Sequence, residues 1–240
     1  MFGKIIKIIF AYRKFGIFKL RRSAFFLTAS ILTLLTTNLC MALDQRTNNS
    51  EILNTQQTDK FLTTVKDRLG KIKNLRANFV QERHMLVFEE PLVAEGILFY
   101  KAPSYLRWEL TKPFSSVLLY VKGRMSKIVK KGDENRQLDI GSQEIMGQVI
   151  GMIISWMRGD LDKSREYFNL TIFQEQNYRI QLVPISESML KMIHSIELIM
   201  SAENYHIQRV IIKEPRGDWI EIRYLKEQWN QELDDDLFKP

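Results

Sequence analysis

Cysteine is nearly absent, because the 240-residue chain has only one, Cys40. Leu39 stands directly before it, where the enzyme that processes lipoproteins requires a small residue, so Cys40 is not expected to carry a lipid anchor. Cleavage after Ala42, argued below, would leave the rest of the chain without cysteine. The folded part is therefore expected to need no disulfide and to use no thiol chemistry.

Histidine and the common catalytic motifs are also scarce. The three histidines, His84, His194 and His206, do not stand beside other ligands at metal-binding spacing. His194 falls on the apolar side of an alternating run, which favours a buried histidine. There is no Gly-x-Ser-x-Gly motif, dinucleotide fingerprint or phosphate loop. Adjacent acids such as Glu89–Glu90 are more often solvated surface than catalytic pairs. We therefore expect a protein that is not an enzyme and that uses no metal or cofactor.

An excess of one charge is absent from most of the chain. The formal net charge is +7, but residues 1–42 hold seven of the 35 basic side chains and none of the 28 acidic ones. The remaining residues therefore carry equal numbers of both signs. A folded part near neutrality offers no broad positive field to phosphate backbones, so no nucleic-acid partner is expected.

The first 42 residues have the pattern of an export signal. A basic head is followed by the uncharged core Phe25–Leu35 and by the small residue Ala42, after which we expect cleavage. The alternative is a retained anchor, because Ser23–Leu43 has no charge and is long enough to span a bilayer. The short core favours cleavage. In both cases the basic residues stay on the cytoplasmic side, and the folded part is placed on the other side of the membrane.

Strand-like alternation of apolar and polar residues dominates the chain after a polar lead-in, residues 43–57. Three runs lie between Leu75 and Pro113, and their inward-facing sets are Ala77, Phe79 and Gln81; Gly96, Leu98 and Tyr100; Leu106, Trp108 and Leu110. A period of two is typical of a strand with one buried face. Val117–Val121 is apolar on both faces, which predicts a strand covered on both sides. About ten such runs joined by short turns predict an antiparallel sheet that curls.

Two stretches have helical periodicity instead. Thr58 offers a helix cap, and apolar residues follow it at helical spacing as far as Ile72. Gly141–Asp160 is apolar around most of a helix, so most of its surface is expected to be buried. The sequence therefore predicts an α+β fold, a strongly curved antiparallel sheet or unclosed β-barrel with an α-helical lid. Residues 43–57 would be a flexible lead-in and residues 58–240 one domain.

The residues of the first strands also carry a resemblance to a known family. From Phe61 to Pro240 the chain resembles the LolA family of periplasmic lipoprotein carriers. The resemblance lies in the order of short motifs. These are Phe79-x-Gln81, Gly96-x-Leu98, Lys101-x-Pro103, Trp108, Gly217-Asp218 and the closing Phe238-x-Pro240.

This resemblance implies a function. Family members shelter the acyl chains of lipoproteins in a hydrophobic cavity and carry them through the periplasm of Gram-negative bacteria. An inner-membrane ABC transporter, LolCDE-like, would load the carrier, and an outer-membrane receptor, LolB-like, would unload it. The carrier would be a monomer with lipoproteins or lipids as cargo. The implied lipid-binding cavity is lined by Phe79, Leu98, Tyr100, Leu106, Trp108, Leu110, Ile150, Ile154 and Met157.

One position departs from the family pattern. The family's functional arginine directly precedes the proline of the Lys-x-Pro motif, and here that residue is Ala102. The chain therefore also resembles divergent members that handle other lipids or glycolipids, and such cargo is the alternative to lipoproteins. A lipid-sensing regulatory protein on the same fold is a further alternative.

Overall fold

The structure, a computed structural model, describes residues 50–131, 134–139 and 144–239. It describes the side chains of these residues except in 129–150. The predicted export signal or anchor, residues 1–42, and the lead-in as far as residue 49 lie outside the described residues. No helix among the described residues combines the length and the apolarity that a bilayer span requires.

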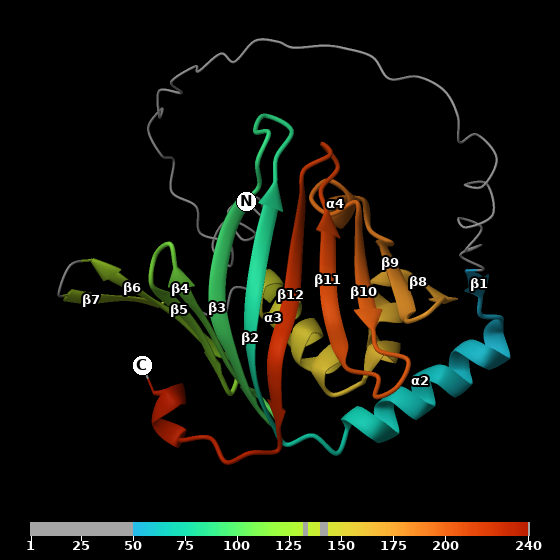
Figure 1. Ribbon diagram of the computed structural model, residues 1–240, viewed down its shortest axis with the longest axis horizontal. Coiled ribbons are helices and arrows are strands. Elements are labelled where there is room, and N and C mark those ends of the chain that lie inside the picture. Colours follow the sequence, from blue (N-terminus) through green and yellow to red (C-terminus); the bar gives the residue numbers. More distant parts are fainter. Residues whose placement is uncertain (1–49, 132–133, 140–143, 240) are drawn as a thin grey trace, which may run out of the picture. The chain divides into compact units, whose positions relative to one another are not determined.

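Twelve strands of the described residues form one sheet (Figure 1). They are β1 (Glu51–Ile52), β2 (Asn74–His84), β3 (Leu92–Lys101), β4 (Tyr105–Lys112), β5 (Ser116–Val121), β6 (Arg124–Lys131), β7 (Glu134–Asp139), β8 (Phe168–Gln174), β9 (Tyr178–Pro184), β10 (Ser195–Met200), β11 (Ile207–Lys213) and β12 (Trp219–Trp229). Their spatial order is β1-β8-β9-β10-β11-β12-β2-β3-β4-β5-β6-β7, and every described pair is antiparallel. Within the described pairings, β1 and β7 remain separate edges. The predicted α+β fold with an unclosed sheet is therefore confirmed.

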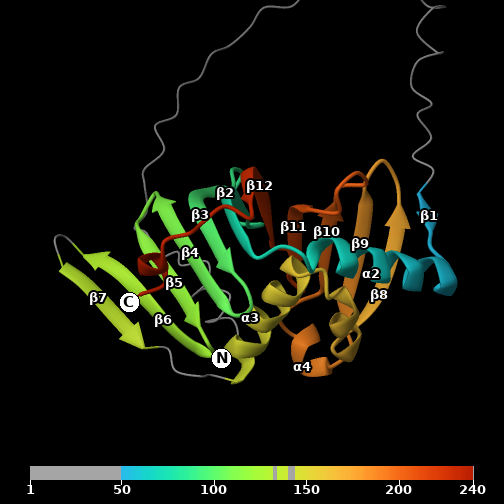
Figure 2. The same cartoon turned by 90° about the horizontal axis from the view of Figure 1, so that it is seen from below.

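The helices lie on the concave side of this sheet. Figure 2 shows the strands as an arc, with α2 (Thr55–Leu69) and α3 (Glu144–Met157) inside it. The short helix α4 (Glu187–Leu190) joins β9 to β10, and the 3₁₀ helix η1 (Leu161–Glu166) follows α3. We call the side of the sheet that faces α2 and α3 the inner face.

Helix α2 begins earlier than the sequence predicts. The Asn54 side chain accepts a hydrogen bond from the Gln57 backbone (3.0 Å), and the Gln57 side chain accepts one from the Asn54 backbone (2.8 Å). This reciprocal capping box starts the helix at Thr55. Thr58 is therefore inside the helix and is not its cap. The predicted lead-in, residues 43–57, is wrong at its end, because β1 and the first turn of α2 already lie within it.

The C-terminal end of α3 is fixed by its neighbours. The Trp156 indole donates a buried hydrogen bond to the Ser164 hydroxyl of η1 (2.8 Å). Asp160 pairs with Lys66 of α2 and with Lys163 of η1, each at 3.2 Å. Gly159 has a positive φ of 73° and packs so closely on α2 that a Cβ there would lie 2.5 Å from the Val65 carbonyl oxygen. The end of α3 is therefore held against α2 and η1.

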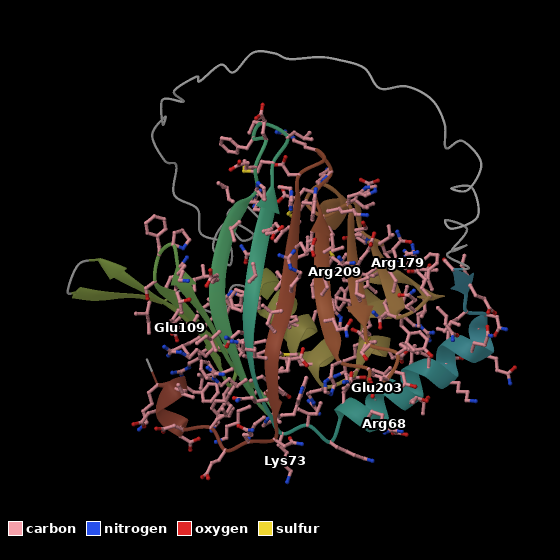
Figure 3. The ribbon with its side chains drawn as sticks, in the orientation of Figure 1. Arg68, Lys73, Glu109, Arg179, Glu203 and Arg209 are labelled. Carbon is pink, nitrogen blue, oxygen red and sulfur yellow. The ribbon has the colours of Figure 1, made fainter. Side chains whose placement is uncertain are left out.

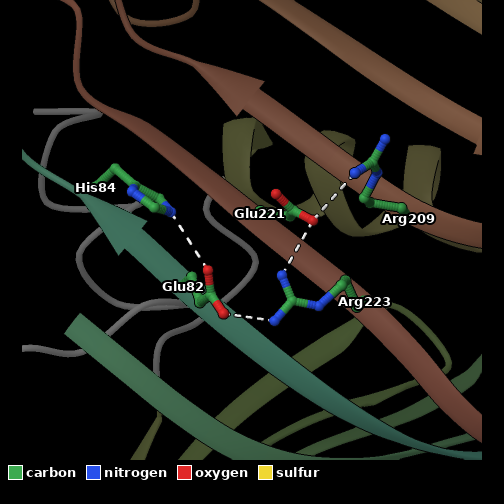
Figure 4. Close-up of polar contacts among 5 residues, drawn as sticks. All are labelled: Glu82, His84, Arg209, Glu221 and Arg223. Atoms are coloured by element: carbon green, nitrogen blue, oxygen red, sulfur yellow. Dashed lines mark hydrogen bonds and ion pairs between the residues drawn. The ribbon is translucent and has the colours of Figure 1, made fainter. Parts of the chain in front are cut away.

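Charged side chains gather on the opposite, outer face of the sheet, where Figure 3 labels Arg179 and Arg209. Glu221 accepts hydrogen bonds from Arg209 (3.4 Å) and Arg223 (3.2 Å), and Arg223 also pairs with Glu82 (Figure 4). The hydrogen bond from Arg223 holds the pKa of Glu82 below its usual range. These pairs link β11, β12 and β2 across the outer face.

The C-terminal segment covers another part of the outer face. The 3₁₀ helix η2 (Asp235–Phe238) places the buried Phe238 ring 5.6 Å from that of Tyr105, and Arg107 donates a hydrogen bond to the Leu237 carbonyl (3.1 Å). This segment contacts β4 and β5. It accounts for the strand β5 being buried on both sides, as its sequence predicts.

Candidate functional site

The inner face of β2, β3 and β4 is a largely apolar surface. All six of the strand residues predicted to line a cavity lie on it and are buried: Phe79, Leu98, Tyr100, Leu106, Trp108 and Leu110. The register places Leu98 opposite Trp108 and Tyr100 opposite Leu106. Paired residues of an antiparallel sheet point to the same side. The sequence pattern therefore correctly brings these side chains together, and their role in binding lipid stays a prediction.

Gly96 shapes the centre of this surface. Phe79 lies across it, because the register pairs the two residues and a Cβ at Gly96 would be 2.3 Å from the Phe79 Cζ. The Phe79 ring packs against the Trp108 ring with 4.3 Å between centroids. The absence of a side chain at Gly96 thus lets an aromatic ring from β2 lie flat over β3 and reach β4.

Helix α3 supplies the remaining predicted residues. Ile154 and Met157 are buried in its last turns, on the concave side of the sheet (Figure 2). Ile150 belongs to the same helix, but its side chain lies outside the described part of the structure. Two of the three predicted helix residues are therefore placed in the interior.

Polar atoms without partners interrupt this apolar interior. The Tyr100 hydroxyl, the Trp108 indole N–H and both amide atoms of Gln81 are buried and have no hydrogen-bond partner among the described residues. Burial raises the pKa of Tyr100 to about 12, against the opposing influence of Arg158, so its hydroxyl keeps its proton near neutral pH. The Tyr100 hydroxyl, the Trp108 indole and the Gln81 amide nitrogen can donate to carbonyl or hydroxyl oxygens of a molecule held against the inner face, and the Gln81 amide oxygen can accept from a hydroxyl.

Lys127 is an interior residue that the sequence analysis did not single out. It lies opposite Leu118 on the inner side of β6 and is buried, and this burial lowers its pKa. The alternation of β6 places Met125 and Lys127 on the same side of the strand but does not say which side that is. A basic residue in that pattern reads as solvent-facing, and only the pairing with β5 shows which side it takes.

A separate pocket of about 400 Å³ lies on the outer face. Its lining comes mainly from β11, β12 and the turn between them: His194, Ile211, Lys213, Glu214, Pro215, Gly217, Asp218, Trp219 and Glu221. His194 is exposed, so its predicted burial is wrong; it stands just before β10, outside the alternating strand. No group of three or more His, Cys, Asp or Glu side chains in the described part of the chain is arranged to hold a metal ion.

Comparison with known families gives one match. The family model described as outer membrane lipoprotein carrier protein LolA matches residues 70–240, which is more than half of the chain. No curated protein matches the sequence.

The solved structures that this chain matches are distant in sequence. The complex of Pseudomonas aeruginosa MucA/MucB is 9% identical with a TM-score of 0.48; the match covers 75% of this chain and 59% of that chain, less than two thirds of its length. The LolA superfamily protein NE2245 from Nitrosomonas europaea is 12% identical, with coverages of 75% and 98% and a TM-score of 0.43. Mycobacterium tuberculosis lipoprotein LppX is 14% identical, with coverages of 73% and 98% and a TM-score of 0.42.

Proposed function

Because this chain belongs to the LolA family of outer membrane lipoprotein carrier proteins, we propose that it is a carrier that shelters acyl chains against the inner face of its sheet. The observation that carries the proposal is the largely apolar surface of β2, β3 and β4 on the side that faces α3, which a few polar groups interrupt. An acyl chain laid on it would contact Phe79, Leu106 and Trp108. The carrier needs no catalytic group for this task.

The proposed route runs through the periplasm, from an inner-membrane ABC transporter of the LolCDE kind to an outer-membrane receptor of the LolB kind. The carrier would act as a monomer, and its cargo would be lipoproteins. Ala102 stands where the family has its arginine. Other lipids or glycolipids are therefore included in the proposed cargo.

The energetics of an acyl chain set what such a carrier must do. Each methylene removed from water contributes about 0.8 kcal/mol, so one long chain contributes about 10 kcal/mol before any opposing cost. Release without nucleotide hydrolysis requires part of this energy to be offset. Moving α3 away from the sheet supplies such an offset, because it exposes Ile154 and Met157, which are buried in the absence of cargo.

Tryptophan fluorescence tests this proposal directly. A brominated fatty acid quenches tryptophans that it contacts, and Trp108 lies on the inner face while Trp219 lines the outer pocket. Quenching should fall strongly in Trp108→Phe and persist in Trp219→Phe. Both changes keep an aromatic ring, so the fold is preserved. Mass spectrometry of an organic-solvent extract would then distinguish an acylated peptide from a glycolipid.

Two results would count against the proposal. The first is an unchanged quenching signal in Trp108→Phe, because the ligand would then not touch the inner face. The second is a signal that disappears in Trp219→Phe, because binding would then belong to the outer pocket.

A further inference from the structure

The two ends of the sheet differ in the side chains that they expose. At one end, large apolar side chains stand out from the connections: Leu86, Val87 and Phe88 between β2 and β3, Tyr167 before β8, and Ile185 and Leu190 between β9 and β10. We call these six residues the apolar rim. Leu86 and Val87 are 76% and 77% exposed, and Phe88 is 55% exposed. Figure 1 shows the β2–β3 hairpin and α4 at the same upper end.

The strand register shows that these connections share one end. His84, the last residue of β2, lies opposite Trp219, and Trp219 lies opposite Lys213, the last residue of β11. Lys213 in turn lies opposite Ser195, the first residue of β10. Phe168 at the start of β8 lies opposite Pro184 at the end of β9. The rim residues therefore follow or precede strand ends that are aligned across the sheet.

The opposite end of the same sheet is polar. Its connections are residues 102–104, 122–123, 175–177 and 201–206. None of them exposes a large apolar side chain to the same degree, in the part of the chain that the structure describes. The connections at the two ends of the sheet can therefore be compared with each other. Exposure of large apolar side chains is a property of the connections at one end and not of turns in this sheet in general.

The rim side chains stand on fixed backbone. The Phe88 backbone donates a hydrogen bond to the Met85 carbonyl (2.9 Å), and the Leu86 backbone donates one to the Asp218 side chain (3.1 Å). On the other side, the Ile185 backbone donates to the Tyr167 carbonyl (2.9 Å). The backbone beneath these apolar side chains is therefore held in place on both sides of the rim.

We propose that the apolar rim docks on the surface of a lipid bilayer. Its two groups of tips are separated by β10, β11 and β12 and hence by about 20 Å at the usual strand spacing. Between them lies the polar turn Glu214–Asp218. A protein partner favours one contiguous apolar patch with a polar border. A bilayer interface accepts separate apolar tips and leaves the polar groups between them at the level of the lipid headgroups.

The charges near the rim indicate whether electrostatic attraction to lipid headgroups would contribute to docking. The acidic side chains in these connections and in the turn between them are Glu89, Glu90, Glu187, Glu214 and Asp218, against the basic Lys191 and Arg216. There is therefore no excess of positive charge to attract anionic lipid. Docking should therefore depend on burial of the apolar tips, with little need for anionic lipid and little sensitivity to salt.

Flotation of the full chain with phosphatidylcholine vesicles tests the proposal through matched variants. Val87→Ser with Phe88→Ser removes two rim side chains, while Ile52→Ser with Leu225→Ser removes two apolar side chains that are exposed elsewhere, 60% and 46% respectively. Burial of one large apolar side chain changes a partition coefficient by about tenfold or more. The rim variant should therefore lose at least tenfold in vesicle binding, and the control variant should bind like the unmodified chain.

Hydrogen exchange locates the contact within the unmodified chain. Phosphatidylcholine vesicles should slow exchange in residues 85–91 and 185–194, and should leave residues 102–104 and 201–206 unchanged. The result should be the same with phosphatidylglycerol vesicles and at high salt. Equal losses in both variants, protection at the polar end, or no binding of the unmodified chain to vesicles would overturn the proposal. Because the rim lies apart from the inner face, a chain that binds vesicles but no fatty acid would keep this inference and contradict the proposed carrier function.

Discussion

Replacing Gly96 with alanine should strongly destabilise the sheet. The new Cβ would lie 2.2 Å from the Glu109 carbonyl oxygen and 2.3 Å from the Phe79 Cζ. The first atom is backbone of the adjacent strand, and the second belongs to a ring that packs against Trp108. Neither can move away as the end of a flexible side chain would. Overpacking costs about 1–3 kcal/mol and occasionally more, and two such contacts place Gly96→Ala near 3 kcal/mol.

A second glycine provides the control for this prediction. Gly151 lies in α3, and a Cβ there would have no atom within 4 Å. Gly151→Ala adds the same methyl group in open space and should stabilise the protein by about 0.5–1 kcal/mol through helix propensity. Urea unfolding followed by far-UV circular dichroism measures both changes. A Gly96→Ala protein within about 0.5 kcal/mol of the unmodified one would refute the position assigned to Phe79.

Three further predictions concern polar groups. Tyr100→Phe removes a buried hydroxyl that has no described partner, so the unfolding free energy should stay the same or rise by up to about 1 kcal/mol; a clear loss in urea unfolding would mean that the hydroxyl is bonded. Arg83→Met should lower the free energy of unfolding by about 2 kcal/mol, because the buried Arg83 pairs with Glu214 at 2.9 Å and that carboxylate would lose its partner. Urea unfolding tests this as well, and an unchanged free energy of unfolding would contradict it. Arg223 holds the pKa of Glu82 low, so the ion pair of Glu82 with Arg223 stabilises the fold above about pH 4.3, and this stabilisation disappears as the pH falls through the folded-state pKa of Glu82. In Glu82→Gln, the melting temperature should therefore depend less on pH in this range. An unchanged dependence would exclude a contribution from this pair.

The strands could be predicted from the sequence because each has one buried face. In β2, residues 74–84, buried and half-buried side chains alternate without a break, as the apolar pattern of Ala77, Phe79 and Gln81 predicts. The pattern repeats in β4, where Leu106, Trp108 and Leu110 are the buried set. A strand that covers a core on one side has to alternate, so its composition reports its orientation. The same reasoning placed six cavity residues on one surface.

Long-range pairing was not readable in this way. Strand β2 pairs with β12, whose residues are far along the chain, and this contact joins the first and last parts of the sheet. Alternation specifies which side of a strand is buried but not which strand is its neighbour. Phe99 shows the same limit, because it is buried although it alternates with the inner-face residues of β3. The Arg76 guanidinium lies 5.9 Å from its ring on the outer side, a contact that depends on the register of β2 and β3.

The inner face is also where the chain departs from what stability alone would favour. An unpaired buried polar group costs about 1–3 kcal/mol. Tyr100, Trp108 and Gln81 each place such a group on one apolar surface, in the described part of the structure. Phenylalanine or leucine at these positions would keep the apolar packing without that cost. The outer face has such an atom as well, the Asn78 Oδ1, although the charges of Glu221 and Arg223 there are paired. Departures of this kind concentrate at functional sites, and those of Tyr100, Trp108 and Gln81 lie on the surface that the proposed cargo would contact.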